Sequence, residues 1–160
     1  MKLILTRHGE SEDKKAGMND EDRHLTDKGN SDIKKIAKFI KSSSWNITHI
    51  FHSPYIRTHE TAKILADDLG FSKELESSDA LACGEGCLKI LPLLSKLNNS
   101  EAIVLVSHNP DITHFAAHLL GNPNLTQNLI FSPGTSIAIN VAKEKFEGGQ
   151  ILWSVSPDYL

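Results

Sequence analysis

Short apolar runs recur along the chain and predict buried strands. They cover residues 2–6 (KLILT), 47–51 (ITHIF) and 102–106 (AIVLV), and each is rich in aliphatic or β-branched side chains. Runs of this kind are typical of strands in a parallel sheet that is covered on both faces. Two further runs, TSIAINVA and QILWSV, flank the polar segment KEKFEGG. The paired glycines of that segment suit a tight turn, so we expect a hairpin there.

The segments between the apolar runs carry the periodicity of amphipathic helices. Apolar residues recur at helical spacing from Ile33 to Ile40 with lysines on the opposite face, and Thr26 is a suitable N-cap for that helix. Three more helices are expected, from Pro54 to Leu69 with Ser53 as N-cap, over 85–98 with a kink at Pro92, and from Asn109-Pro110 onward with Ile112, Phe115, Ala116 and Leu119 buried. Strands that alternate with helices predict a single α/β domain over residues 1–160, a three-layer α/β/α sandwich with a mostly parallel central sheet.

Composition and charge narrow the class of protein. The chain has 160 residues, of which 39% are hydrophobic and 23% charged, and its formal net charge is −3. These values are ordinary for one globular domain. Lys and Arg are scattered, without the basic patch of a nucleic-acid binder, and no apolar run is long enough to span a membrane. Two cysteines and the lack of a recognisable secretory signal lead us to expect a cytoplasmic, reduced protein.

Polar side chains of one kind follow three of the predicted strands. Arg7 and His8 follow the first, Arg57 falls in the first turn of the helix after the second, and His108 follows the third. Ligands of open α/β sheets bind beyond the carboxyl ends of the strands, so we expect these side chains to converge. Arginine pairs bidentately with phosphate oxygens, and helix N-termini favour anions. The pattern therefore predicts a pocket for a phosphoryl group.

A neutral histidine in such a pocket would be a nucleophile. An unprotonated imidazole can attack phosphorus and form a covalent phosphohistidine. Burial and neighbouring cations both disfavour the imidazolium and so keep the ring reactive. We expect His8 and His108 to divide the work, with one attacking and the other stabilising the charge of the transferring group. Positioning and charge neutralisation supply most of the remaining catalysis in phosphoryl transfer.

Four motifs, in order, resemble those of the histidine phosphatase (phosphoglycerate mutase-like) superfamily. They are RHGE at 7–10, LTDKG at 25–29, SPYIRTHETA at 53–62 and SHNP at 107–110. The short length, ACGEG at 82–86 and the ending WSVSPDYL are similar to the SixA-type phosphohistidine phosphatases within that superfamily. The resemblance implies a phosphoglycerate mutase-like fold and a hydrolase that needs no metal or other cofactor. Its implied substrate is a phosphorylated protein, such as a histidine-containing phosphorelay domain, or a small phosphorylated molecule.

The resemblance also implies a role for each residue expected in the pocket. His8 matches the nucleophile of the family, and His108 matches its second pocket histidine. Arg7 and Arg57 match the two arginines that clamp the phosphoryl group. Agreement of four motifs with their predicted strand and helix positions makes this assignment far more specific than an isolated Arg-His-Gly.

Positions relative to the four motifs point to candidates for the general acid and for the rim of the pocket. The acid of the family lies on a short segment after the second helix, where Asp79 is the best match and Glu85 the second. Ser11 is a further candidate for substrate binding, and turn chemistry explains it equally well. Mutases and broad phosphatases commonly carry an Asn where this chain has Lys14, and the insertions that roof the mutase pocket are absent. We therefore expect a shallow, open site.

Other readings of the same residues stay open at this point. They are a small-molecule phosphomonoesterase or mutase, and a non-catalytic module that binds phosphorylated partners. A metal site is not expected, because His114 and His118 stand four apart on one helix without an evident third ligand. Cys83 and Cys87 have neither zinc nor redox spacing. The mixed-charge segment 12–23 is expected to be a solvated loop, with a place beside the substrate path as the alternative.

Overall fold

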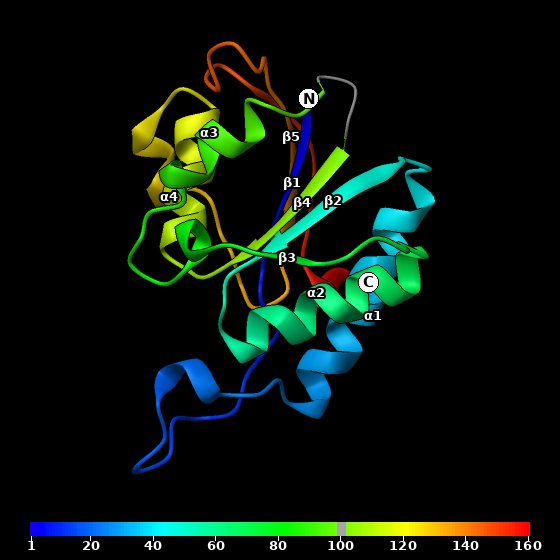
Figure 1. Cartoon of the computed structure of the whole chain (residues 1–160), viewed down its shortest axis with the longest axis vertical. Coiled ribbons are helices and arrows are strands. Elements are labelled where there is room, and N and C mark those ends of the chain that lie inside the picture. The colour runs from blue at the N-terminus through cyan, green and yellow to red at the C-terminus, as the bar shows by residue number, and fades with distance from the viewer. Residues whose placement is uncertain (99–101) are drawn as a thin grey trace.

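A mixed sheet forms the centre of the molecule and carries helices on both faces (Figure 1). The computed structural model describes residues 1–98 and 102–160, and within them the sheet has six strands: β1 (Lys2–Arg7), β2 (Ile47–His52), β3 (Glu76–Ser77), β4 (Ala102–Ser107), β5 (Ser136–Asn140) and β6 (Gln150–Val155). The α-helices of this part are α1 (Asp27–Ser42), α2 (Ile56–Leu69), α3 (Leu91–Leu94) and α4 (Asp111–Leu119).

The strand order is β3-β2-β4-β1-β5-β6. The first four strands of this order are mutually parallel, and β5 and β6 add antiparallel pairs at one edge. The predicted α/β architecture with a mostly parallel sheet is thereby confirmed, and so is the C-terminal hairpin. Figure 1 shows the N-terminus and the start of β4 at one end of the sheet, with the blue segment of residues 10–25 projecting beyond the other end.

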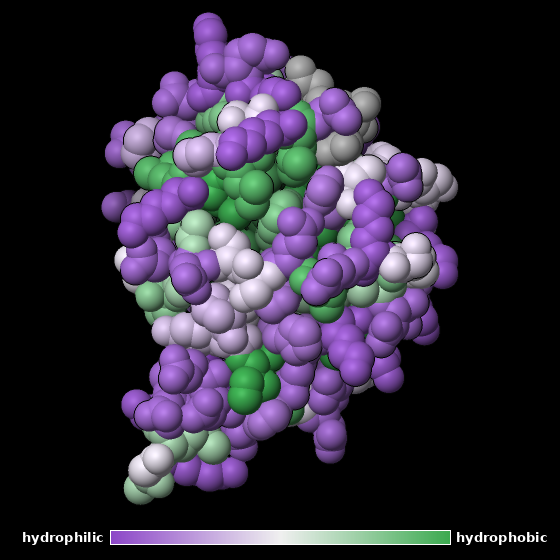
Figure 2. All heavy atoms as spheres, viewed as in Figure 1, coloured by the Kyte–Doolittle hydropathy of each residue, from purple (hydrophilic) through white to green (hydrophobic). Residues whose placement is uncertain are grey.

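Alternating side chains of the central strands feed two separate cores. Leu3 and Leu5 of β1 pack in the cluster that includes Phe115 of α4, whereas Ile4 packs in the cluster that includes Ile36 of α1. All of these side chains are buried. Because successive strand residues point to opposite faces, one apolar run serves both layers of helices. Figure 2 shows the outer surface over α1 and α2 as mainly hydrophilic, with an apolar area beside α3.

Two of the predicted helix starts agree with the structure. Thr26 caps α1, and its Oγ1 accepts the backbone N–H of Gly29 at 3.0 Å. Helix α4 buries the four apolar residues expected of it. None of the described helices is both long enough and apolar enough to cross a membrane.

The other two helix predictions are wrong in detail. Helix α2 begins at Ile56, two residues later than expected, because Ser53, directly after β2, stays bound to β4 and donates its N–H to the Val106 carbonyl at 3.1 Å. The helix expected over 85–98 is reduced to a 3-10 turn, η3 (Leu88–Ile90), and the four-residue α3. Gly84 and Gly86 with positive φ values interrupt the backbone just before this point.

Gly29 generates a prediction, because a Cβ at this position would lie 2.1 Å from the carbonyl oxygen of Glu10. Alanine normally stabilises a helix interior over glycine by about 1 kcal/mol. Here the contact is with backbone, which cannot rotate away, so we expect Gly29→Ala to lower Tm by at least about 5 °C. Thermal unfolding followed by circular dichroism measures this. Ser31→Ala, at an exposed position of the same helix, is the matched control and should leave Tm unchanged or raise it. Equal Tm values for both variants would contradict this packing.

Candidate active site

Three neighbouring strands end together and deliver side chains to one pocket. Arg7 of β1 pairs with Ser107 of β4, and the next residue, His8, donates its backbone N–H to the Ser107 carbonyl at 3.1 Å. A cavity of about 330 Å³ lies beyond these strand ends and is lined by Arg7, His8, Glu10, Ser11, Asp20, Arg23, Arg57, Cys83, His108, Asn109 and Pro133. The structure thus brings together five of the residues expected from the sequence, Arg7, His8, Ser11, Arg57 and His108.

The His8 ring is held with one nitrogen lone pair facing the pocket arginine. Its Nδ1 lies 2.7 Å from the carbonyl oxygen of Gly9 and donates to it, so Nε2 carries the lone pair and accepts from Nε of Arg57 at 3.2 Å. Burial lowers the pKa of His8 to about 4, and the charges of Arg57 and Arg7 act in the same direction. The ring is therefore neutral at neutral pH, as a nucleophile requires.

Arg57 connects the two histidines and is itself almost fully buried. Its Nη2 lies 3.3 Å from Nδ1 of His108, while its Nε–H points to His8. The guanidinium also stacks over the ring of Tyr55, 4.9 Å from the ring centroid. Arg57 is the second residue of α2, so the start of that helix places the cation between the ends of β1 and β4.

His108 is fixed from both ring nitrogens. Because Arg57 can only donate, Nδ1 of His108 is the acceptor, and Nε2–H donates to Oγ of Ser53 at 2.7 Å. The pKa of His108 is lowered to about 3, mainly by burial, and electrostatic interactions with His8 and Arg57 act in the same direction. The rings of His8 and His108 meet edge to face with centroids 5.2 Å apart. Ser53, expected as a helix cap, thus orients the second pocket histidine instead.

Arg7 keeps an unused donor in the pocket wall. Its Nη1 donates to the carbonyl of Phe131 at 2.7 Å, and its backbone N–H donates to Thr135 at 3.0 Å. Its buried Nε has no hydrogen-bond partner among the described residues. A buried, unsatisfied donor costs about 1–3 kcal/mol, more for a charged group. Because the guanidinium groups of Arg7 and Arg57 both line the cavity, the arrangement favours an anionic ligand with oxygen acceptors.

The mixed-charge segment reaches into the pocket, so the expectation of a merely solvated loop is wrong. Asp20 in the 3-10 turn η1 (Asp20–Asp22) accepts from Nη2 of Arg57 at 2.8 Å through its carboxylate, and from Nη1 at 2.5 Å through its carbonyl. Arg23 donates to the Asp20 carboxylate and to Ser11 Oγ, both at 2.9 Å. Burial would raise the pKa of Asp20, but hydrogen bonds from Arg23 and Arg57 hold it below its usual range.

This segment is tied to the body of the protein through α2. One carboxylate oxygen of Glu60 accepts a hydrogen bond from Nδ1 of His24 at 2.6 Å, and the other accepts from the backbone N–H of Leu25 at 2.8 Å. The hydrogen bond that His24 donates to Glu60 raises the pKa of His24. Asp20 and Arg23 were missed at the level of sequence because a charge-rich segment has no periodicity that tells a pocket residue from a surface residue.

The expected general acid lies outside the cavity lining. Asp79 is exposed in the 3-10 turn η2 (Asp79–Leu81), which turns Leu81 into the core instead. Glu85 is exposed and pairs with Lys89. The carboxylates that line the cavity are Glu10, whose Oε1 accepts from Thr26 at 2.8 Å, and Asp20. The geometry therefore gives no support to Asp79 or Glu85 as the acid.

The remaining candidates from the sequence lie apart from this chemistry. Among the described residues, no group of three or more His, Cys, Asp or Glu side chains could hold a metal ion. Cys83 is exposed at the pocket rim, and Cys87 is buried with Sγ 3.4 Å from Oγ of Ser107. Burial raises the pKa of the Cys87 thiol to about 12, which leaves it uncharged and suits a packing role.

Comparison with known proteins agrees with this pocket. The model of the histidine phosphatase superfamily (branch 1) matches residues 3–82, which include the arginines and the first histidine described above. The chain belongs to the histidine phosphatase superfamily. Phosphohistidine phosphatase SixA of Escherichia coli (strain K12) is 28% identical over 159 residues, 98% of this chain and 94% of that protein. An uncharacterized protein of Picosynechococcus sp. is 32% identical over 122 residues, 72% of this chain and 71% of that protein.

The histidine phosphatase fold extends over the whole chain. A solved structure of the protein histidine phosphatase SixA complexed with tungstate superimposes with a TM-score of 0.85, covers 99% of both chains and is 23% identical. At this level of identity the likeness concerns the fold.

The titration of the pocket histidines provides a test of this geometry. We expect the rings of His8 and His108 to stay neutral as the pH falls through the ordinary histidine range, since burial lowers both pKa values, to about 4 and about 3. His24 should instead become protonated above that range, because Glu60 raises its pKa. Nitrogen-15 NMR of the ring signals measures each titration, with His8→Asn and His108→Asn supplying the assignments. A midpoint for His8 at or above the ordinary value of a free histidine would contradict the buried site.

Proposed function

We propose that this protein is a phosphatase that acts through a covalent phosphohistidine on His8, and that its substrate is phosphohistidine on another protein. The observation that carries the proposal is the neutral His8 ring, whose Nε2 lone pair faces Arg57 in a pocket that Arg7 also lines. The SixA relative, similar over 98% of this chain, supports the choice of substrate.

The first step transfers the phosphoryl group to the protein. Arg7 and Arg57 hold the phosphoryl oxygens and neutralise their charge, which is the main contribution a protein makes to such a reaction. The Nε–H of Arg57 first turns from Nε2 of His8 to a phosphoryl oxygen, which frees the lone pair of the ring. Nε2 then attacks phosphorus, so the P–Nε2 bond forms while the bond from phosphorus to the leaving group breaks. The Nδ1–H of His8 keeps its hydrogen bond to the Gly9 carbonyl. This bond stabilises the ring as the ring gains positive character.

The carboxylates of the pocket favour a nitrogen leaving group. Solvent can protonate the ring nitrogen of a substrate phosphohistidine that is not bonded to phosphorus. The ring then departs as neutral imidazole. An alkoxide from a phosphomonoester needs a protonated acid beside it, a contribution of about 10²–10⁴ in rate. Asp20 is held ionised by two arginines and is a poor donor. The pocket is therefore better suited to breaking a P–N bond than a P–O bond.

The second step returns the protein to its starting state. A water molecule attacks phosphorus, the P–Nε2 bond breaks, and its electron pair returns to the neutral ring of His8. Inorganic phosphate leaves with the oxygen of that water, and the proton released goes to solvent or to a pocket carboxylate. We assign residues 1–160 to one domain, which carries all the residues used in this cycle, and we propose a cytoplasmic location, which the low cysteine content supports.

A substrate panel tests the choice of leaving group. We expect kcat/KM for a phosphohistidine protein and for phosphoramidate to exceed that for phosphoserine and 3-phosphoglycerate by at least about 10², the factor that acid catalysis would otherwise supply. Phosphate release is the measurement. Isomerisation of the phosphoglycerate would identify a mutase. Tight capture of the phosphoprotein without release would identify a binding module, and equal rates on all substrates would overturn the preference for nitrogen.

Substitutions in the pocket test the roles of the residues. Arg57→Ala should lower kcat/KM by about 10³ on either class of substrate, in line with other arginines that hold a transferring phosphoryl group. His8→Ala should abolish turnover and the acid-labile phosphoenzyme seen by rapid quench with labelled substrate. Asp79→Asn, an exposed carboxylate outside the cavity, is the matched control and should change the rate less than twofold. Retained phosphoenzyme in His8→Ala would refute the nucleophile.

A further inference from the structure

A second and larger hollow lies on the other side of the loop that supports Arg7 and His8. It has a volume of about 490 Å³, and its lining includes Ile130, Ser132, Thr135, Ile151, Asp158 and Tyr159. We refer to it as the β6 groove, because it lies between residues 128–132 and the edge strand β6. Ser132 lines the groove and the adjacent Pro133 lines the phosphoryl pocket, so one short segment separates the two hollows.

The segment between the two hollows is bonded directly to the phosphoryl pocket. The carbonyl of Phe131 accepts from Arg7, and the N–H of Gly134 donates to the carbonyl of His8 at 3.0 Å. A protein whose phosphohistidine reaches His8 must lie against the surface around the pocket, because a histidine side chain is short. The β6 groove is the hollow that continues this surface directly.

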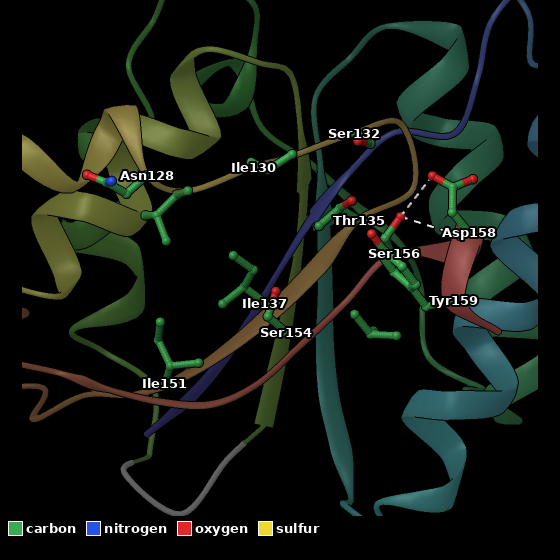
Figure 3. A pocket seen from close by; sticks show the side chains of 12 residues that line it. Asn128, Ile130, Ser132, Thr135, Ile137, Ile151, Ser154, Ser156, Asp158 and Tyr159 are labelled. Carbon is green, nitrogen blue, oxygen red and sulfur yellow. Dashed lines mark hydrogen bonds between the residues drawn. The ribbon is translucent and has the colours of Figure 1, made fainter.

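One side of the β6 groove exposes apolar side chains. Five of the seven large hydrophobic residues exposed in the described part of the chain fall at 130 or within 151–160. Ile130 is 78% exposed and Ile151 46%, and both line this side of the groove. Tyr159, which is 87% exposed, lies on the opposite side near Ser156 and Asp158 (Figure 3). Exposed apolar side chains that cluster in this way commonly mark protein interaction sites. Figure 3 shows Ile130, Ile137 and Ile151 together on one side of the groove.

The other side of the groove is polar and carries a carboxylate. Ser132, Thr135, Ser156 and Asp158 gather there in Figure 3. Thr135 is 2% exposed, and its Oγ1 has no hydrogen-bond partner among the described residues. The Asp158 carboxylate accepts from Oγ of Ser156 at 3.3 Å, and none of the described residues that line the groove is a Lys or Arg. The pKa of Lys28 in α1 is raised mainly by its hydrogen bond with Asp32 and also by the charge of Asp158, so one cation of the protein already lies near Asp158. An occupant with a basic group would pair with Asp158, whereas the Thr135 hydroxyl is closed off beneath the groove surface.

We propose that the β6 groove docks the phosphorylated partner protein, through a segment with apolar side chains against Ile130 and Ile151 and a Lys or Arg against Asp158. This inference rests on the proposed function and adds to it the surface that selects the substrate. The phosphoryl pocket recognises a phosphoryl group that every phosphohistidine shares, so discrimination among partner proteins has to come from contacts outside it. The groove supplies such contacts beside the pocket and leaves the reacting groups untouched.

Kinetics on two substrates separate docking from catalysis. A panel of phosphohistidine proteins is compared with phosphoramidate, which is too small to reach the groove. For the protein with the highest kcat/KM, we expect Ile130→Asp and Asp158→Lys each to lower kcat/KM at least tenfold, mainly by raising KM, with phosphoramidate turnover changed less than twofold. Leu93→Asp, at an exposed apolar residue of α3 outside the groove, is the control and should affect neither substrate.

Each other outcome counts against the inference. Unchanged kcat/KM on the phosphoprotein, or no phosphoprotein hydrolysed faster than free phosphohistidine, would show that the groove contributes nothing to docking. Equal losses on both substrates would make its residues structural. A dimer in analytical ultracentrifugation that Ile130→Asp abolishes would assign the groove to a second copy of this chain. Failure of the unsubstituted protein on phosphoramidate and all phosphoproteins would instead refute the proposed function, and the inference with it.

Discussion

The parallel register of β1, β4 and β2 is the constraint on which the site depends. Arg7 stands opposite Ser107, so the residues that follow, His8 and His108, leave the sheet side by side. A shift of one residue in β1 would exchange its two faces and turn Ile4 toward the wrong layer of helices. The apolar side chains that bury both faces therefore also set the distance between the two pocket histidines. Stability and chemistry share this requirement.

The sequence predicted those parts of the fold whose signals are local. The three buried strands, the C-terminal hairpin and the helix capped by Thr26 follow from periodicity and capping within a few residues. The meeting of Arg7, His8, Arg57 and His108 also followed, because parallel strands must end at a common edge. The resemblance of four ordered motifs gave the same grouping independently.

The parts that the sequence did not predict depend on contacts between distant segments. Ser53 is of a residue type that favours N-caps, yet it lies directly after β2, and its hydroxyl accepts a hydrogen bond from His108, 55 residues away. Asp20 joins Arg57 across 37 residues with no repeating pattern to reveal the contact. The Asp79 side chain is exposed because the short 3-10 turn η2 turns Leu81 into the core. Composition and spacing carry no information on any of these, since each is decided by packing in three dimensions.

The contact of Asp20 with Arg57 has a consequence for how tightly the site holds its product. The carboxylate and carbonyl of Asp20 use the same guanidinium nitrogens that a phosphate ion would approach. A tethered anion of this kind competes at a high effective concentration, which the anchoring of its loop by Glu60 maintains. Free phosphate, like the phosphoryl group of a substrate, then has to displace an intramolecular rival. A site built in this way holds a phosphate ion less tightly than its two arginines alone would.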